Sequence, residues 1–86
     1  MSWGVEFSEL ADKDLENLDT PVKKKVIEKI DWLAENFENV TPVPLKGEFR
    51  DFYKLRVGDW RVFYRVDWEG RIIFVAYIKN RDSAYR

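Results

Sequence analysis

The segment of residues 52–66 limits the possible folds of this chain more than any other part of its sequence. Apolar and polar residues alternate on both sides of Gly58-Asp59, as they do in two neighbouring β-strands. A two-residue loop of Gly and Asp is a strong β-hairpin signal, and it also fixes which residues of the two strands lie opposite each other. The sequence therefore predicts a hairpin in which Arg56 lies opposite Arg61.

The predicted register also assigns each residue to a face of the hairpin, because residues opposite each other share a face. One face carries Tyr53, Leu55, Val57, Trp60, Val62 and Tyr64, and the second face carries Phe52, Lys54, Arg56, Arg61, Phe63 and Arg65. Like charges directly opposite each other destabilise a hairpin. Keeping Arg56 opposite Arg61 therefore indicates that the second face binds an anionic ligand.

The rest of the chain is expected to form a short strand, two helices, a connector and a last strand. In order, these elements are predicted at residues 4–7, 8–18, 20–38, 39–47 and 71–78. Ser8 can cap the first helix, and Thr20-Pro21 is a typical helix start, with Thr20 as the N-cap and proline at the first helical position. The tail from Asp82 onward is too short for another helix.

These elements predict an α+β fold, in which two N-terminal helices pack on one face of an antiparallel β-sheet in the order β-α-α-β-β-β. One domain is expected over residues 1–86, with the first strand at the free edge of the last. The expected core brings Ile27, Ile30, Leu33 and Phe37 onto Leu55, Val62, Tyr64 and Phe74. A second turn is expected at Trp68-Glu69-Gly70, and if it has three residues, Arg61 pairs with Tyr77. Continued alternation then adds Lys79 and Arg81 to the second face, whereas a two-residue turn would reverse this assignment.

The composition excludes several kinds of site. The chain has no cysteine and no histidine, so it has no disulfide, no thiolate metal site and no imidazole base. Its carboxylates show no spacing typical of metal ligands, and neither a metal nor another cofactor is expected. No apolar run is long enough to span a membrane and the N-terminus lacks a signal-peptide pattern, so a cytoplasmic protein without membrane association is expected.

Charge is unevenly distributed along the chain. Residues 1–44 carry five lysines against ten acidic residues, a net charge of −5, and residues 45–86 carry ten Lys or Arg against six acidic residues, a net charge of +4. Such asymmetry is typical of a basic half that binds a polyanion. Solvated surface charge is the alternative, and charge alone favours it. The lysines of the second helix are likewise interpreted as a solvated face: Lys23, Lys24, Lys25 and Lys29.

Phosphoryl chemistry is the reaction type that these side chains suit best, because it depends mainly on positioning and charge stabilisation. Arginine suits both, since its planar fork binds phosphate through two hydrogen bonds. The candidate phosphate ligands are Lys54, Arg56, Arg61 and Arg81, and the rings interleaved with them, which suit single-stranded RNA, are Phe52, Phe63, Tyr77 and Tyr85. An equally supported alternative is an apolar patch of Phe52 and Phe63 beneath a partner protein whose carboxylates pair with the arginines.

Four segments resemble the RelE/ParE superfamily of toxin–antitoxin toxins. They are Leu45-Lys46-Gly47, residues 52–64, residues 71–75, and Arg81 with Tyr85. Their order and spacing cover nearly the whole chain, and the shared Leu-Arg-Val-Gly-Asp-aromatic-Arg core specifies the fold better than the activity. By this resemblance, a RelE-like chain would cleave mRNA in the ribosomal A site through attack of an RNA 2′-hydroxyl on the neighbouring phosphate, whereas a ParE-like chain would poison DNA gyrase.

The resemblance implies a role for each cationic residue. Lys54 and Arg56 would favour the ionised 2′-hydroxyl. Arg61 would stabilise the phosphorane and Arg81 would assist the leaving oxygen, while Tyr85 would stack on or orient the nucleotide. Further RNA contacts are expected at Lys46, Phe52, Phe63, Arg65 and Lys79. ParE toxins generally lack the full cationic and tyrosine set, which favours the RelE branch.

Three features depart from the family pattern. Arg56 stands where the best-known RelE pattern has lysine, and a guanidinium group stays protonated, which favours electrostatic activation over proton abstraction. Asn80 and Val43 replace a histidine and a glutamate of other branches, so a Glu–His acid–base pair is excluded. The chain also has an acidic isoelectric point near 5.5, whereas most of these toxins are strongly basic. This weakens the expected binding to RNA.

The leading interpretation is therefore a type II toxin that acts as a ribosome-dependent, metal-independent mRNA endoribonuclease. Its expected partners are the ribosome, mRNA and a cognate antitoxin, whose acidic segment would cover Lys54, Arg61 and Arg81. The alternative is a non-catalytic protein, either a ParE-like gyrase inhibitor or a degenerate toxin that only binds its antitoxin.

Overall fold

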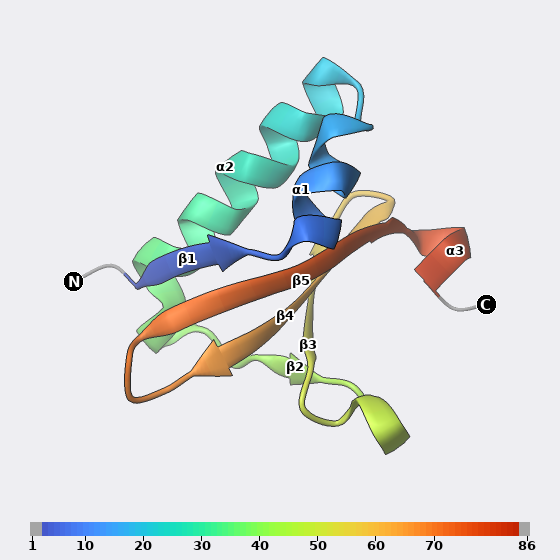
Figure 1. Cartoon of the computed structure of the whole chain (residues 1–86). Helices are drawn as coiled ribbons and strands as arrows, with labels where there is room; N and C mark the ends of the chain where they lie inside the picture. The colour runs from blue at the N-terminus through green and yellow to red at the C-terminus, as the bar shows by residue number, and fades with distance from the viewer. Residues whose placement is uncertain (1–2, 85–86) are drawn as a thin grey trace.

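The computed structural model describes residues 3–84 and has two helices covering one face of a five-stranded sheet (Figure 1). Its elements are β1 (Gly4–Phe7), α1 (Glu9–Glu16), α2 (Thr20–Asn36), the 3₁₀ turn η1 (Phe37–Asn39), β2 (Val43–Pro44), the 3₁₀ turn η2 (Gly47–Phe49), β3 (Tyr53–Val57), β4 (Trp60–Asp67), β5 (Ile72–Asn80) and α3 (Arg81–Ala84). The strand order is β1-β5-β4-β3-β2, antiparallel except for the parallel pair of β1 and β5. The predicted α+β fold and the place of the first strand are confirmed.

The hairpin of β3 and β4 has the predicted register. Arg56 lies opposite Arg61, and Lys54 lies opposite Phe63. Gly58 has a φ of 58°, in the left-handed region that a tight two-residue turn requires and that glycine adopts without a steric penalty. Local turn chemistry was therefore sufficient to predict this pairing.

The pairing of β4 with β5 differs from the prediction in two places. Asp67 pairs with Ile72, so the turn has four residues instead of three. A register shift then falls between Phe63 and Tyr64, where Ala76 is left without a partner on β4. Each shift by one residue exchanges the faces of the strand, so the two shifts cancel beyond the bulge. Arg61 consequently pairs with Lys79 and not with Tyr77, although Lys79 still lies on the predicted face.

Side chains of α1 occupy the edge of β5 beyond the end of β1. Ser8, the N-cap of α1, accepts a hydrogen bond from the Ala11 N–H at 3.0 Å, and its hydroxyl donates to the carbonyl of the bulge residue Ala76. The Asp14 carboxylate accepts a hydrogen bond from the Ile78 N–H at 2.8 Å. These contacts satisfy backbone groups of an edge that would otherwise remain open.

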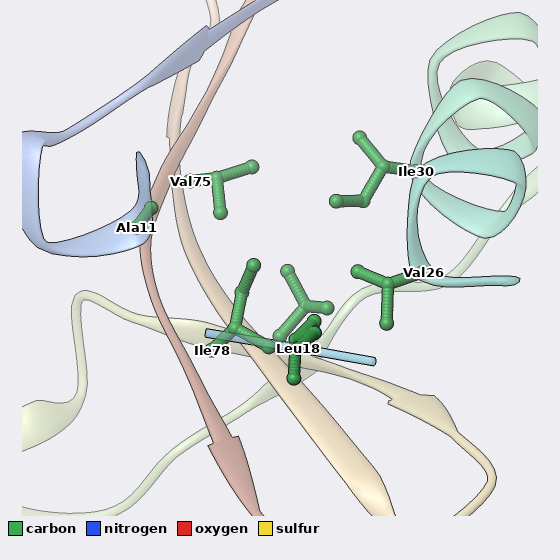
Figure 2. Packing of buried hydrophobic residues seen from close by; sticks show 7 residues of the cluster. Ala11, Leu18, Val26, Ile30, Val75 and Ile78 are labelled. Atoms are coloured by element: carbon green, nitrogen blue, oxygen red, sulfur yellow. The ribbon is translucent and has the colours of Figure 1, made fainter. Parts of the chain in front are cut away.

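The core lies between the two helices and the sheet (Figure 2). Val26 and Ile30 point from α2 toward Val75 and Ile78 of β5, and all four are at most 1% exposed. A second buried cluster surrounds the end of α2 and contains Trp3, Leu33, Ala34, Phe37, Tyr64 and Ile73. The predicted burial of Ile30, Leu33 and Phe37 is confirmed.

Two residues expected in the core lie near its rim or on the other face. Ile27 of α2 is 39% exposed, because it lies at the side of the helix and not on the stripe that faces the sheet. Phe74 is 38% exposed on the opposite face of the sheet, because the four-residue turn reverses the faces of β5 before the bulge. Both predictions were wrong.

The element ends also differ in detail from those expected. Asp19, and not Thr20, is the N-cap of α2, and Pro21 lies in its first turn. The connector contains β2, a two-residue strand that the prolines at its ends did not reveal. The tail forms the short helix α3, contrary to the prediction, where the Arg81 N–H donates to the Asp59 carbonyl at 2.7 Å. None of the helices in residues 3–84 is long and apolar enough to cross a membrane.

Candidate functional site

The sheet face opposite α1 and α2 brings together most of the predicted site residues. The strand register places Arg56, Arg61 and Lys79 side by side across β3, β4 and β5. We call these three residues the cationic row. Lys54, Phe63 and Tyr77 form the neighbouring row on the same face.

Arg61 is the central member of the cationic row and is nearly inaccessible. Its side chain is 3% exposed, and Nη1 donates hydrogen bonds to the carbonyls of Gly58 and Trp60, each at 2.9 Å. Its Nε is buried and has no hydrogen-bond partner among residues 3–84. The alternation of the sequence gives the face of this residue correctly, but it contains no signal for this burial.

Arg56 and Arg81 are the exposed cations at this end of the sheet. Arg81 directly follows β5, and its N–H binds the carbonyl of Asp59 in the turn between β3 and β4. That turn also connects the strands that carry Arg56 and Arg61. The fold therefore joins these three arginines through one turn, although Arg56 and Arg81 are 25 positions apart in the sequence.

The two lysines of the site are partly buried. Lys79 forms an ion pair with Asp14 of α1, with 3.3 Å between Nζ and Oδ1. Lys54 lies on β3 between Val43 of β2 and Phe63 of β4. Lys46 is exposed in the loop before η2 and lies outside the strands that carry the cationic row. Tyr85 lies outside the described residues.

The aromatic residues of this face form a chain of ring contacts. The ring centroids of Phe63 and Tyr77 lie 4.8 Å apart, those of Tyr77 and Phe52 6.1 Å, and those of Phe52 and Phe49 6.4 Å. Phe63 is 3% exposed, whereas Phe52 and Tyr77 are partly exposed. The Arg65 guanidinium lies 5.6 Å from the Phe52 ring. Phe52 and Tyr77, together with the exposed Phe74 on the same sheet face, are thus rings that a nucleotide base could reach.

Phe49 is an exposed ring that the sequence alone did not indicate. It is 46% exposed and continues the ring contacts beyond the sheet edge. Its position three residues before Phe52, in a glycine-containing segment between two strands, was the available signal.

A second feature missed from the sequence is a groove between α2 and β3. One part, of about 440 Å³, is lined by Lys25, Glu28, Lys29, Trp32, Arg56, Val57 and Gly58. A neighbouring part, of about 420 Å³, shares Lys29 and Arg56 and reaches Leu33, Leu55 and Tyr64. The Lys29 ammonium lies 4.0 Å from the Trp32 ring centroid. Two of the lysines interpreted as a solvated face therefore line a groove that also contains Arg56.

The arrangement offers charge and aromatic surface but no metal ligand set. In residues 3–84 no three acidic side chains gather so that they could hold a metal ion. Exposed guanidinium groups can bind and polarise a phosphate, and the adjoining rings can stack on bases. The chemistry that this face supports best is therefore binding of a nucleic acid or of another polyanion.

Comparison with known sequences identifies the protein family to which this chain is similar. A model of the ParE toxin of type II toxin–antitoxin systems matches residues 5–85. The chain is also 35% identical, over 94 aligned positions, to a protein of Methanocaldococcus jannaschii that is provisionally named toxin RelE1. That alignment covers 100% of this chain and 98% of the relative.

Comparison with solved structures gives similar folds. A chain of the toxin–antitoxin complex RelBE2 from Mycobacterium tuberculosis is 26% identical with a TM-score of 0.84, over 94% of this chain and 93% of that one. A variant of the Escherichia coli toxin RelE in the free state is 25% identical with a TM-score of 0.77, over 99% and 90%. A chain of the archaeal RelE–RelB complex from Pyrococcus horikoshii is 26% identical with a TM-score of 0.70, over 94% and 97%.

Proposed function

We propose that this chain, which belongs to the ParE toxin family of type II toxin–antitoxin systems within the RelE/ParE superfamily, cleaves mRNA on the ribosome. The observation that carries the proposal is the cationic row. Two strands place like charges opposite each other, an arrangement that destabilises a hairpin and that a bound phosphate would offset. Partly exposed aromatic rings adjoin the row on the same face.

The proposed reaction needs no metal. The RNA 2′-oxygen attacks the neighbouring phosphorus, the bond from phosphorus to the 5′-oxygen breaks, and a 2′,3′-cyclic phosphate forms. Water takes up the proton of the 2′-hydroxyl and supplies one to the leaving oxygen. The protein then contributes mainly by holding the phosphate and stabilising the charge that develops on it.

We assign the following roles within this proposal. Lys54 and Arg56 favour the ionised 2′-hydroxyl, and Arg81 stabilises the leaving oxygen. Arg61 favours the phosphorane by its charge from beneath the surface, because a buried charge acts through a low dielectric. Tyr85 orients the nucleotide. The remaining proposed RNA contacts are Lys46, Phe52, Phe63, Arg65 and Lys79.

A toxin of a type II system has an antitoxin as its partner, and four of the similar solved structures are RelE–RelB or RelBE complexes. We propose that an acidic segment of the antitoxin covers the sheet face that carries the cationic row, where it would pair with Arg56 and Arg81 and block access to Lys54. Ribosome and mRNA are the proposed targets, which places the proposed activity in the cytoplasm.

One observation favours a second candidate, a toxin without nuclease activity. Phe63 is 3% exposed and Lys79 already pairs with Asp14, so two of the proposed RNA contacts are engaged within the chain. Arg61, which is proposed to stabilise the phosphorane, is likewise 3% exposed. A ParE-like gyrase inhibitor or a degenerate toxin that only binds its antitoxin requires no such contacts.

Primer extension on a message translated by purified ribosomes separates these candidates. The proposal predicts new 5′ ends that appear only when the chain and the ribosomes are both present, and that disappear when the antitoxin is added. Inhibition of gyrase-driven DNA supercoiling without any mRNA cleavage would instead support the ParE-like function.

A further inference from the structure

We propose that the turn of Gly58, Asp59 and Trp60 is the device that positions Arg81 against the cationic row, with Arg61 acting as its brace. This inference rests on the proposed function where it concerns catalysis, but its structural part does not. We use the name β3–β4 turn for these three residues, which are the two residues of the tight turn and the first residue of β4.

Three successive carbonyls of the β3–β4 turn each accept a hydrogen bond from an arginine. Those of Gly58 and Trp60 accept from Arg61 Nη1, at 2.9 Å each, and that of Asp59 accepts from the Arg81 N–H, at 2.7 Å. The Arg61 side chain therefore holds the first and third carbonyls of the turn. The middle carbonyl, that of Asp59, holds the backbone that follows β5.

Arg61 suits the role of a brace because its donor reaches both ends of the turn. A hydrogen bond from a charged group to a carbonyl is roughly twice as strong as one between neutral groups. The side chain is 3% exposed, so water does not compete freely for these two carbonyls. Because Nε has no partner in residues 3–84, the turn carbonyls are the contacts that fix this guanidinium there.

The consequence for Arg81 follows from its place at the start of α3. The helix has only four residues, too few to hold its own position without contacts to the sheet. The hydrogen bond to Asp59 ties its first residue to the end of the hairpin that carries Arg56. A shift of the turn would move the Arg81 guanidinium relative to Arg56, and a misplacement of about 1 Å can lower a reaction rate on the order of 100-fold.

Gly58 allows the turn to be disturbed without removing any charge. Its φ is 58°, and a Cβ atom added to it would lie more than 4 Å from every atom beyond its two chain neighbours. A substitution there tests backbone conformation and not packing. Asparagine adopts this region readily, whereas the β-branched valine does so only under strain, so the two variants form a matched pair.

Amide hydrogen exchange on the full chain tests the structural part. We expect the exchange of the Arg81 amide to become about tenfold faster in Gly58→Val and in Arg61→Met, because one hydrogen bond is weakened, and to stay within threefold of the wild type in Gly58→Asn. Unchanged protection of the Val75 amide shows that each variant is folded. An Arg81 amide that exchanges at the wild-type rate in Arg61→Met overturns the role of Arg61 as a brace.

Cleavage kinetics test the catalytic part. Gly58→Val should lower kcat for ribosome-dependent cleavage at least tenfold with KM changed less than threefold, and Gly58→Asn should restore kcat. Normal cleavage by Gly58→Val, in a chain whose Arg81 amide exchanges rapidly, would overturn the positioning role. A wild type that does not cleave refutes the proposed function, and the exchange experiment then still decides whether the turn holds Arg81.

Discussion

The guanidinium group of Arg61 is buried against backbone carbonyls and forms no ion pair within residues 3–84. Burying a charge without an opposite charge costs free energy, even when hydrogen bonds reduce the cost. Its row neighbours Arg56 and Lys79 add repulsion. An anion bound over the row would offset both costs, which is the electrostatic reason to expect a phosphate there.

Tyr64 provides a test of the core at the level of one side chain. Burial raises the pKa of its phenol from 10.0 to about 12, with a smaller contribution from nearby Tyr53. In the unfolded chain the phenol loses its proton near pH 10, while in the folded chain it keeps it up to about pH 12. The unfolded state therefore binds fewer protons in this range, and stability must fall as the pH rises.

We expect Tyr64 to remove about 2 to 3 kcal/mol from the free energy of unfolding between pH 9 and pH 12. Urea denaturation at a series of pH values measures this loss. Tyr64→Phe has no phenol to ionise, so its stability should fall less steeply than that of the wild type over the same range. Parallel curves for the two proteins would show that Tyr64 is not shielded from water.

At the level of single elements, α2 buries one stripe and exposes another. Ile30→Ala should lower the free energy of unfolding by roughly 2–5 kcal/mol, because a large side chain that is 1% exposed leaves a cavity. Ile27→Ala, on the same helix at 39% exposure, should cost well under half as much. Equal losses in equilibrium denaturation would contradict the assigned helix face.

The contact of α1 with the edge of β5 makes a second prediction for an element. Asp14→Ala leaves the Ile78 N–H without its acceptor, and an unpaired buried donor costs about 1–3 kcal/mol. Thermal denaturation should show this loss, whereas Glu16→Ala, an exposed residue of the same helix, serves as the control. An Asp14→Ala protein as stable as the control would show that the carboxylate does not support the strand edge.

The face and register of a strand were predicted correctly where the residues that determine them lie close together in the sequence. The register of β3 with β4 follows from two turn residues, and it was predicted correctly. The face of Phe74 depends on a four-residue turn in which Arg71 has a φ of 55°, and that of Lys79 depends on a bulge supported by Ser8, which is distant in sequence. An alternation pattern does not give the length of a turn, and the bulge has a contact with Ser8 that forms only in the folded chain.

The candidate site was predictable to the same extent. Alternation placed Lys54, Arg56 and Arg61 on one face, but it could not indicate that Arg61 turns back onto carbonyls of its own hairpin. The ion pair of Lys79 with Asp14 and the groove beside α2 were also missed, because each joins segments far apart in the sequence.

At the level of the whole molecule, an acidic N-terminal half contributes α1 and α2, and a basic C-terminal half contributes most of the sheet. The sheet face that carries the cationic row is therefore the surface expected to bind RNA. If three cations contact phosphates, raising the salt from 50 to 200 mM should weaken ribosome binding on the order of 20-fold. Sedimentation with ribosomes at several salt concentrations measures this, and an affinity independent of salt would contradict an electrostatic interface.

Cleavage by the wild type and by Arg81→Ala, compared by primer extension on a translated message, tests the proposed nuclease most directly. Removing one group that stabilises transition-state charge typically costs on the order of 10²–10³ in rate. The variant should keep its fold, because Arg81 is exposed and its N–H remains in alanine. Arg71→Ala, which removes an exposed arginine from the β4–β5 turn, is the matched control.

We expect ribosome-dependent cuts with the wild type and with Arg71→Ala. With Arg81→Ala, we expect both the cuts and the growth arrest to be lost. Cuts of equal intensity from Arg81→Ala would contradict the proposed site. Growth arrest by a wild-type chain that makes no cuts would contradict the nuclease function itself.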